Sequence, residues 1–240
     1  MLVQYVMRHL NLNEVEEKLI LKIRSFVGTK NVFIGISGGI DSAVTAFLCV
    51  KALGRKRVFG VLMPYGRQKD INDALAVAGQ LSIKYFSKDI KPIVDQYKLA
   101  DNKFVLANIM SRVRMTILYA HSNHKDGLVA GTTNKSEMAV GYFTKFGDGG
   151  CDFEPIAGLY KTEIFQLAKQ LNVPQDVITK KPSAGLWNDQ FDEDELGFTY
   201  NDLDRFLQGD QVSSEVQLDI KKIISLSEHK RHLPPTISID

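Results

Sequence analysis

Residues 31–42 read NVFIGISGGIDS. The apolar, β-branched first half predicts a buried strand over Asn31–Ile36. From Ser37 through the two glycines that follow, the backbone can turn sharply and approach a ligand, because glycine carries no Cβ. The apolar run Ala43–Leu53 then predicts a helix. A strand, a glycine turn and a helix N-terminus together predict an anion-binding cradle, since unpaired N–H groups and the helix dipole point at one place.

The cradle differs from the common phosphate loop, which needs Gly, four residues, a second Gly, Lys and then Ser or Thr. Ile40 stands where the second Gly would be, and no lysine follows it. Asp41 follows the glycines instead, and a carboxylate beside a phosphate is repulsive unless a divalent cation lies between them. The residues therefore predict a phosphate bridged by Mg²⁺, with cationic side chains from elsewhere in the chain. The alternative is a tight turn with a helix cap, because Ser, Gly and Asp all suit caps.

Composition sets the broad class of the protein. The chain has 240 residues, of which 44% are hydrophobic and 24% charged, so one large α/β domain over residues 1–240 is expected. A net charge of +2 does not indicate nucleic-acid binding, and no stretch approaches the roughly 20 apolar residues of a membrane span. The charged and apolar residues of Met1–Ile20 predict an amphipathic helix rather than a signal peptide. Cys49 and Cys151 are too few for a disulfide framework or a zinc set, so a cytoplasmic location is expected.

Apolar strand patterns alternate with helical patterns, the arrangement of a parallel sheet with right-handed crossovers. The further predicted strands are Arg57–Met63, Ile83–Ser87 and Gly127–Gly131. The further predicted helices are Asp70–Leu81, Asn102–His121, Tyr160–Leu171, Phe198–Gln208 and Val212–His232. We therefore expect a Rossmann-like α/β fold with three layers, in which helices flank an open, mostly parallel, twisted sheet. Ligands bind beyond the carboxyl ends of such strands, so Ser37, Pro64 and Thr132 should surround one crevice.

Glu137 is the second candidate ligand for Mg²⁺. The sequence GTTNKSE, residues 131–137, follows the fourth predicted strand and places Glu137 in the first turn of the next helix. Together with Asp41 it would supply two carboxylates from two strand ends, and Mg²⁺ prefers one or two carboxylates with phosphate oxygens. Taken alone, this glutamate would more simply be a helix cap.

The missing positive charge has several candidate sources, namely Lys145, Lys161, Lys230 and Arg231. Each of them, taken singly, is more often a solvated surface residue. Lys161 is the best candidate, because it opens a helix near the same edge of the sheet.

Two arginines on the predicted helix Asn102–His121 need a separate argument. Arg112 and Arg114 are about 200° apart around a helix, so both cannot face one ligand. Asn108 shares a face with Arg112. We therefore expect that face to meet a phosphate and Arg114 to point elsewhere.

Glycines recur through residues 141–158, which predicts a long loop, and long loops inside compact domains are usually functional or disordered. The loop also carries aromatic and acidic residues, namely Tyr142, Phe143, Phe146, Asp148 and Asp152. It could clamp a flat ring and hydrogen-bond a ribose or carboxamide. The alternative is an Ω-loop with a structural role only.

With these motifs in place, SGGIDS at residues 37–42 resembles the pyrophosphate loop of the N-type ATP pyrophosphatases. Later segments resemble the NAD synthetases of that superfamily and run in the family's order. These segments are residues 131–137, 141–150, 159–163, 181–184, 192–197 and 229–231. The resemblance covers roughly residues 30–232, and a run of this kind is far more specific than the first motif alone.

The resemblance implies a role for each matching residue. The residues implied to bind ATP are Gly35, Ile36, Ser37, Gly38, Gly39, Ile40, Asp41, Ser42, Thr132, Lys161 and Ser183. Those implied to bind the dinucleotide substrate are Arg112, Lys145, Asp152, His229 and Lys230. Asp41 and Glu137 are implied to hold Mg²⁺. Two positions depart from the family, since Gly185 replaces the usual acid and residues 188–191 replace a small polar stretch.

The reaction implied is that of a ligase which amidates deamido-NAD, as the last step of NAD biosynthesis. The carboxylate attacks ATP, pyrophosphate leaves, and ammonia converts the adenylate to NAD and AMP. Little acid–base chemistry is required, so positioning and charge neutralisation should dominate. Residues before Asn31 make about one helix, so no glutaminase domain and free ammonia as donor are expected. The resemblance further implies a homodimer that acts on small molecules and binds neither nucleic acid nor membrane.

Two alternatives remain at this point. The first is another ligase of the superfamily, either GMP-forming or tRNA-thiolating. Thiolation usually calls for reactive cysteines and a basic surface, whereas Cys49 lies in an apolar helix and the net charge is only +2. The second is a domain that binds ATP without turnover, which would not need to keep Asp41, Glu137 and Lys161.

Overall fold

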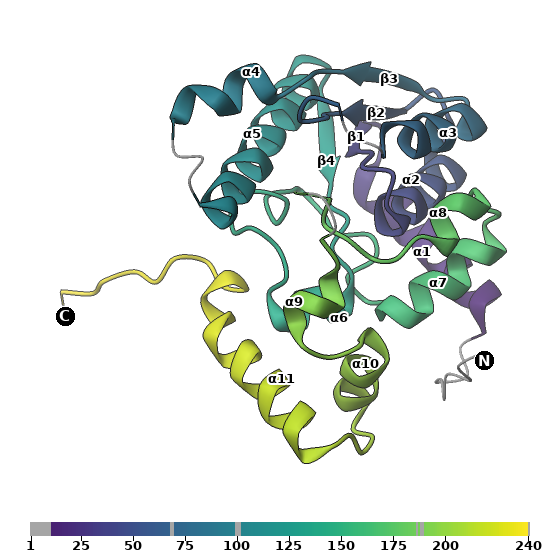
Figure 1. The fold of residues 1–240 in the computed structure, drawn as a ribbon. Coiled ribbons are helices and arrows are strands. Elements are labelled where there is room, and N and C mark those ends of the chain that lie inside the picture. Colours follow the sequence, from purple (N-terminus) through teal and green to yellow (C-terminus); the bar gives the residue numbers. More distant parts are fainter. Residues whose placement is uncertain (1–10, 68–69, 99–101, 186, 188–189, 240) are drawn as a thin grey trace.

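The computed structural model describes residues 11–67, 70–98, 102–185, 187 and 190–239. In that part of the chain the strands form one four-stranded sheet, parallel throughout, in the order β3-β2-β1-β4 (Figure 1). The strands are β1 Asn31–Gly35, β2 Val58–Leu62, β3 Lys84–Ser87 and β4 Gly127–Ala130. Each predicted strand is confirmed to within about one residue at either end, because alternation and apolar runs are local signals.

Strands and helices alternate along the first 140 residues, as the sequence pattern predicted. The helices are α1 Leu12–Val27, α2 Ile40–Leu53, α3 Ile71–Leu81, α4 Lys91–Val94, α5 Lys103–His124, α6 Lys135–Val140, α7 Lys161–Gln170, α8 Gln175–Thr179, α9 Asp192–Leu196, α10 Tyr200–Gln208 and α11 Ser214–Leu226. Two 3₁₀ turns, η1 Asp95–Tyr97 and η2 Glu228–Lys230, complete the described elements. None of the helices in this part of the chain combines the length and apolarity that crossing a membrane requires.

The central strand β1 shows how the helices divide between the two faces of the sheet. Val32 and Ile34 face one side and Phe33 the other, because successive residues of a strand point to opposite faces. On the first side, buried residues of α1, α2, α3, α7 and α8 form the larger core. On the second side, α4 and α5 pack around Phe33, whose ring stacks on Phe59 at 5.0 Å. The result is the predicted arrangement of helices, sheet and helices in three layers.

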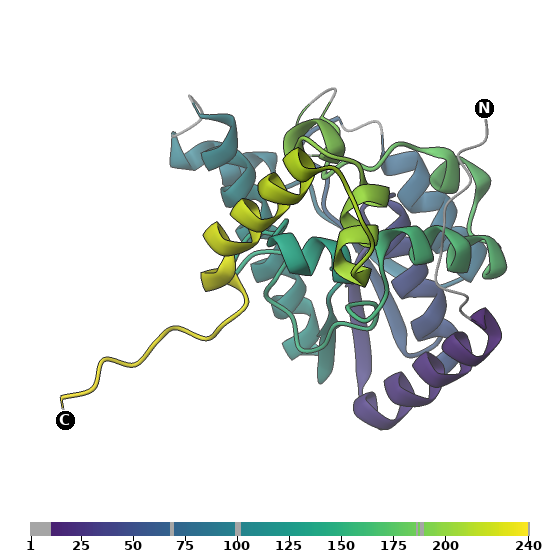
Figure 2. The ribbon, with the colours of Figure 1, turned by 90° about the horizontal axis from the view of Figure 1, so that it is seen from below.

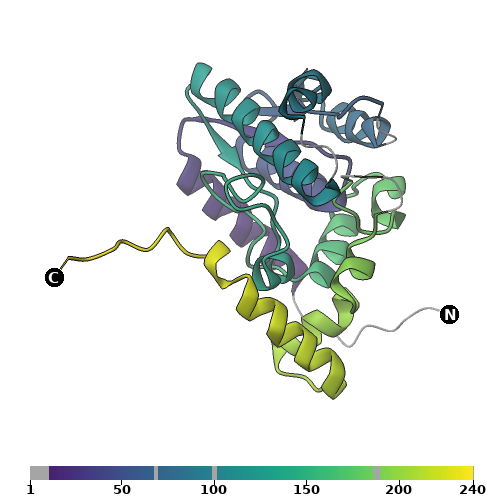
Figure 3. The ribbon, with the colours of Figure 1, turned by 60° about the vertical axis from the view of Figure 1, so that its left-hand side comes forward.

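A third hydrophobic cluster lies beyond these layers. It joins α6, α9, α10 and α11 through Val140, Leu196, Leu203 and Ile220, all of them buried. Figures 2 and 3 show α10 and α11 next to each other outside the helices that cover the sheet, with the last residues of the chain running away from the body. These C-terminal helices therefore flank the carboxyl edge of the sheet rather than cover one of its faces.

Several helices differ from their predicted bounds, and for α2 and α11 the structure shows the reason. Helix α2 begins at Ile40, three residues before the predicted start, because the extended Gly39 is its N-cap. The predicted helix Val212–His232 ends early, at Leu226, where Arg231 folds back and donates to the carbonyl of Ile224 at 2.6 Å. Helix α1 continues past the predicted end at Ile20 to Val27. The start of the predicted helix Met1–Ile20 lies outside the described residues.

Two short helices were not predicted. Helix α4 carries Pro92 in its first turn, and Pro174 is the N-cap of α8. Proline fixes φ near the helical value and lacks only an N–H that the first turn leaves unpaired. In both places a proline, which usually indicates a turn or loop in sequence analysis, stands at the start of a helix instead.

Candidate functional site

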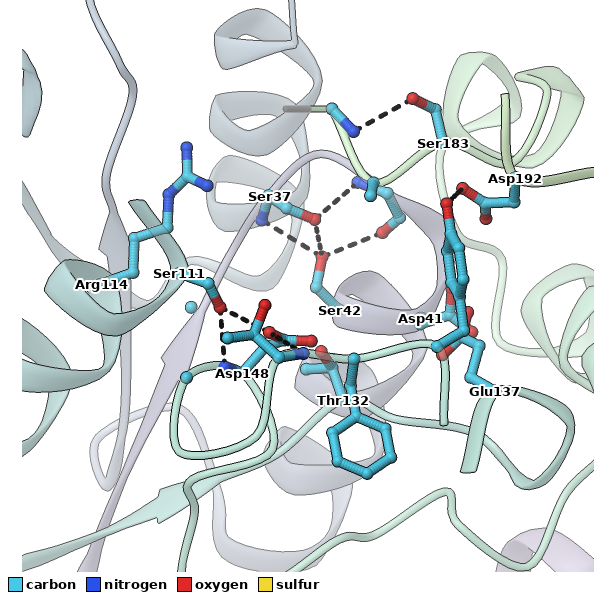
Figure 4. Close-up of a pocket in the computed structure, with 18 of the residues that line it drawn as sticks. Ser37, Asp41, Ser42, Ser111, Arg114, Thr132, Glu137, Asp148, Ser183 and Asp192 are labelled. Carbon is cyan, nitrogen blue, oxygen red and sulfur yellow. Dashed lines mark hydrogen bonds between the residues drawn. The ribbon is translucent and has the colours of Figure 1, made fainter. Parts of the chain in front are cut away.

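A cavity of about 840 Å³ opens at the carboxyl edge of the sheet. Residues that follow three different strands line it, among them Ser37 after β1, Pro64 after β2 and Thr132 after β4. The expectation that these strand ends surround one crevice is therefore confirmed. Figure 4 shows the lining from several elements, with Ser37, Ser42 and Asp41 on one segment and Ser183 on another.

The turn between β1 and α2 is held by its own side chains. Ser37 N–H donates to Ser42 Oγ at 3.3 Å, and Gly39 N–H donates to Ser37 Oγ at 3.1 Å. Ser42 Oγ donates in turn to the carbonyl of Gly39 at 2.9 Å (Figure 4). Gly39 is the N-cap of α2 and makes no side-chain cap, so the first N–H groups of the helix remain available to an anion.

Gly38 is the position where this turn requires glycine. Its φ is +83°, a value that residues with a side chain rarely adopt. A Cβ at this position would stand 2.5 Å from the carbonyl oxygen of Asp70 at the start of α3. Because that obstacle is backbone, the turn and α3 could not both keep their places if residue 38 carried a side chain.

Asp41, Glu137 and Lys161 meet at the floor of the cavity from α2, α6 and α7. Lys161 Nζ lies 2.5 Å from Asp41 Oδ2 and 3.0 Å from Glu137 Oε1. Only 2% of the lysine side chain is exposed, so the ammonium is committed to these two carboxylates. The two predicted metal ligands and the predicted phosphate-binding lysine thus converge, although they are up to 120 residues apart in sequence.

Further polar groups brace this centre. Asn134 donates to Asp41 Oδ1 at 2.9 Å and forms a capping box with Glu137 at the start of α6. Tyr200 OH lies 3.4 Å from Glu137 Oε1 and 3.1 Å from Asp192 Oδ2, so its single proton can serve either carboxylate. These hydrogen bonds connect α9 and α10 to the strand-end residues, in addition to the apolar cluster that joins the same helices to α6.

The centre gathers three carboxyl groups, those of Asp41, Glu137 and Asp192, around the single ammonium of Lys161. Burial and the charge of Asp41 raise the pKa of Glu137. Burial acts to lower the pKa of Lys161, but the charges of Asp41 and Glu137 outweigh it and raise this pKa above its ordinary value. Burial also raises the pKa of Asp192. Lys161 therefore stays protonated, and one ammonium is shared among carboxylates that would accept a further cation.

Among the described residues, no three His, Cys, Asp or Glu side chains group as a metal site. Asp41 and Glu137 could therefore hold a cation only together with oxygen atoms from a ligand. Such a ligand set suits Mg²⁺, which binds through one or two carboxylates and completes its shell with phosphates and water.

The wall of the cavity formed by α5 contradicts the prediction for the two arginines. Arg114 lines the cavity and anchors its Nε on the carbonyl of Met63 at 3.1 Å. Arg112 is exposed, is not among the lining residues, and donates to the carbonyl of Lys145 at 3.3 Å. Burial lowers the pKa of Arg114 to about 10, which leaves the guanidinium charged at neutral pH. The spacing argument was correct that only one of the two lines this cavity, but that residue is Arg114, which was expected to point elsewhere.

The other residues implied to bind the dinucleotide lie at or behind one side of the cavity. Lys230 lines it and donates to the carbonyls of Gly141 and Phe143 at 2.7 and 2.8 Å. Lys145 donates to the carbonyl of His229, which brings these two residues together. Asp152 accepts from Val129 N–H at 2.7 Å and, like Lys145 and His229, is absent from the cavity lining.

The segment after α8 is tied across the mouth of the cavity. Lys180 Nζ lies 2.5 Å from Asp70 Oδ1 and 2.9 Å from Asp73 Oδ2 of α3. Ser183, which lines the cavity, accepts from Gly185 N–H at 3.0 Å. A Cβ at Gly185 would stand 3.3 Å from Asp70 Oδ2, so a side chain at this position would meet the carboxylate of Asp70.

Several residues of the site were missed by sequence reasoning. Sequence reasoning gave no role to Asn134, Lys180 or Tyr200, placed Arg114 away from the ligand, and explained Asp192 as part of a charged helix turn. The capping sequence from Asn134 to Glu137 was a usable signal, because Asn at the N-cap with Glu three residues later is a known start pattern. The others act through partners distant in sequence, which composition and spacing do not reveal.

Comparisons with known proteins agree with this geometry. Residues 12–234 match the NAD synthase family. The NH₃-dependent NAD⁺ synthetase of Pyrococcus horikoshii is 46% identical over 95% of each chain, and that of Archaeoglobus fulgidus is 44% identical over 96% of this chain and 98% of its own. Among solved structures, the NMN synthetase of Francisella tularensis has a TM-score of 0.91 at 36% identity, covering 96% of this chain and 100% of its own. The NH₃-dependent NAD synthetase of Campylobacter jejuni has a TM-score of 0.81 at 32% identity, covering 95% and 100%. The chain belongs to the NAD synthase family.

Proposed function

We propose that this protein amidates the carboxylate of deamido-NAD with ammonia and ATP, and releases NAD, AMP and pyrophosphate. The observation that carries the proposal is the meeting of the glycine turn with Asp41, Glu137 and Lys161 on one cavity. The family and the names of its close relatives support the same reaction. The protein is then a ligase that forms a C–N bond and consumes ATP as a co-substrate.

The chain's own residues suit the first half of this reaction. The turn Ser37–Ser42 offers N–H groups at a helix N-terminus, where the phosphates of ATP would bind. Asp41 stands near the end of the same turn. Lys161, from α7, lies beside it and brings a positive charge to the turn. The carboxylate oxygen of the substrate attacks the α-phosphorus, the bond from that phosphorus to pyrophosphate breaks, and an acyl adenylate forms. The charge that leaves with pyrophosphate develops where these donors lie.

Mg²⁺ fits this site by the chemistry of its donors. Asp41 and Glu137 would hold the ion, because both carboxyl groups line the cavity and share a single ammonium. When bound, the ion supplies charge neutralisation for the phosphates. Asn134 and Tyr200 would keep the two carboxylates in place while the ligand enters.

The second half of the reaction needs little from the protein beyond orientation. Ammonia attacks the carbonyl carbon of the adenylate, the bond to AMP breaks, and the nitrogen loses a proton to form the amide. Arg114 and Lys230 are cations on the cavity lining away from Lys161, and the negatively charged substrate would lie between them. Positioning of this kind supplies a large share of the rate when two reactants must meet.

We further propose free ammonia as the nitrogen donor, because the relatives from Pyrococcus horikoshii and Archaeoglobus fulgidus, both named NH₃-dependent, match the chain along 95% and 98% of their length. The glutamine-dependent NAD⁺ synthetase of Acinetobacter baumannii is matched over only 49% of its chain, at 28% identity and a TM-score of 0.69. One catalytic domain, a cytoplasmic location and a homodimer complete the proposal. Exposed apolar residues on α1 and α5, such as Phe26 and Phe104, are candidate interface positions.

A second candidate reaction is amidation of the corresponding mononucleotide to NMN. It is favoured by the TM-score of 0.91 to the NMN synthetase of Francisella tularensis. Both reactions activate the same pyridine carboxylate with ATP, so the turn and the centre at Lys161 suit either. The difference lies only in the adenylate half that the dinucleotide carries in addition.

A direct assay separates these possibilities. The protein is mixed with MgATP, ammonium chloride and either deamido-NAD or the mononucleotide acid, and the products are resolved by chromatography. NAD and AMP in equal amounts, with a higher kcat/KM for the dinucleotide, is the expected result. A preference for the mononucleotide would favour NMN synthesis, and ADP as product would contradict both reactions.

A further inference from the structure

Glu154 is a titratable group that the proposed reaction does not use. It lies in the loop between α6 and α7, one residue after Phe153, which pairs with Ala130 at the end of β4. Its Oε2 accepts the N–H of Thr133 at 3.1 Å. Its Oε1 is buried and accepts no hydrogen bond from the described residues. A carboxyl group therefore sits directly behind the turn that carries Thr132 into the cavity.

The fit between Glu154 and this turn is close. A Cβ at Gly131 would stand 2.3 Å from Glu154 Cδ and 2.4 Å from each carboxyl oxygen. Gly131 does not have a positive φ, so the absence of a side chain is required by the carboxyl group and not by the backbone conformation. Gly131 N–H donates to the carbonyl of Phe153 at 2.8 Å, which fixes the other end of the turn.

We propose that Glu154 is a positioning residue, which holds the Gly131–Thr133 turn so that Thr132 meets ATP. This inference rests on the proposed function for the identity of the ligand. The mechanism is a charge-assisted hydrogen bond, because an ionised carboxylate is a stronger acceptor for Thr133 N–H than a neutral acid. Thr132 then depends on a residue that does not itself line the cavity.

The surroundings make this hydrogen bond sensitive to pH. Burial raises the pKa of Glu154 to about 7, although hydrogen bonds from Cys151 and Thr133 act to lower it. The titratable groups that face it are Cys151 and Asp148 of the same loop, and no salt bridge reaches it within the described residues. Near neutral pH the acceptor therefore changes between its strong ionised form and its weaker neutral form.

The test compares Glu154→Gln and Glu154→Ala with the wild-type protein. Binding of a Mg²⁺ complex of α,β-methylene-ATP, which cannot release pyrophosphate, is measured by calorimetry between about pH 6 and pH 8.5. Glutamine imitates the neutral acid, so Glu154→Gln should bind about tenfold more weakly than wild type above pH 8 and almost equally below pH 6. Glu154→Ala loses the acceptor altogether and should bind more weakly than wild type at every pH.

The matched control is Glu16→Gln. Glu16 is also a partly buried carboxylate, which accepts from Gln170 at 2.7 Å, but it lies between α1 and α7 away from the cavity. Its analogue affinity should equal that of wild type at every pH. If Glu154→Gln lowers the melting temperature but leaves the affinity and its pH profile unchanged, Glu154 is merely structural and the inference is wrong. Because the readout is binding, a wild-type protein that binds the analogue but makes no NAD would contradict the proposed function and leave this test valid.

Discussion

Two turns at the carboxyl edge of the sheet serve one cavity but are supported in different ways. The turn Ser37–Ser42 after β1 is held by hydrogen bonds between residues two to five apart in sequence. The turn Gly131–Thr133 after β4 is held from behind by Glu154, 21 residues further along the chain. The first turn is therefore a local structure, while the second depends on how the loop 141–158 folds back onto the sheet.

The difference separates the consequences of mutation in the two turns. Changes in Ser37–Ser42, called the local turn below, should alter the phosphate site directly, because its side chains and N–H groups border the cavity. Changes in Gly131–Thr133, called the supported turn, should act at a distance, through Glu154. Both turns meet at Asp41, which lies in α2 and accepts from Asn134 of the second strand end at 2.9 Å.

The largest effect is expected where the two turns meet. Asp41→Asn keeps the shape of the side chain and the acceptor for Asn134 but removes the charge that faces Lys161. We expect kcat to fall by about 100- to 1,000-fold, since one preorganised electrostatic contact in an active site contributes effects of this size. Steady-state formation of AMP is the measurement, with the melting temperature recorded beside it.

The control for that variant is Asp126→Asn, which breaks only a surface ion pair with Lys30 at 3.2 Å. Exposed pairs of this kind contribute between about zero and 1 kcal/mol, so activity should be unchanged. An Asp41→Asn protein that retains more than about a tenth of wild-type kcat would show that neither turn needs this charge.

The second prediction compares the loss of stability when each turn's glycine, Gly38 or Gly131, is replaced by alanine. Gly38→Ala meets the backbone of Asp70 and a φ of +83°, and should destabilise the protein by about 2 to 3 kcal/mol. Gly131→Ala meets a side chain, that of Glu154, which can be removed by mutation. We expect Gly131→Ala to be costly alone but much less so in a Glu154→Ala background, as measured by urea unfolding of all four combinations.

For Gly38→Ala, the corresponding second mutation, Asp70→Ala, should not reduce the loss of stability. Shortening Asp70 to alanine leaves its carbonyl oxygen in place, so Gly38→Ala should cost as much with Asp70→Ala as without it. Strictly additive effects of Gly131→Ala and Glu154→Ala, within about 0.5 kcal/mol, would contradict the proposed support of the second turn.

The third effect is a pH dependence that only the supported turn can have. The pKa of Glu154 is raised from 4.5 to about 7 in the folded protein, so the folded state binds more protons than the unfolded state between these values. Its contribution therefore favours folding at low pH and is lost as the pH rises from about 4.5 to about 7, by up to about 3 kcal/mol. The difference in unfolding free energy between wild type and Glu154→Gln, measured across this range, should fall with pH.

Ser42→Ala is the reference for that measurement, because the local turn contains no titratable partner for this hydroxyl. Its difference from wild type should be the same at every pH. A wild-type protein that gains stability relative to Glu154→Gln as the pH rises would reverse the sign and exclude a raised pKa at Glu154.

The same contrast explains how much of the molecule could be predicted from sequence. The strands and most helices were found because alternation, apolar runs and glycine turns act over a few residues. The local turn and Asp41 were found for the same reason. Glu137 and Lys161 could be proposed as their partners only because parallel strands bring their carboxyl ends to one edge.

The supported turn marks the limit of that reasoning. Glu154 has no periodic or motif signal, and its partner Thr133 is reached only after the chain folds back at Ala130 and Phe153. The prediction that Arg114 points away from the ligand was wrong for a related reason. Helical spacing fixes which residues share a face, but the packing of Met110 and Val113 against the sheet decides which face meets the cavity.

The smallest effect tests the local turn itself. Ser42→Ala removes a buried hydroxyl that joins Ser37 and Gly39, and should reduce the free energy of unfolding by about 1 kcal/mol, as one hydrogen-bonding group usually does. ATP should bind a few-fold more weakly, because Ser37 N–H loses its acceptor and the carbonyl of Gly39 loses its donor, so the turn before α2 is held less firmly. Ser214→Ala on the exposed start of α11 is the control. If the two serine variants unfold alike and bind ATP alike, the turn is held by its backbone, and the division into a local and a supported turn would rest on Glu154 alone.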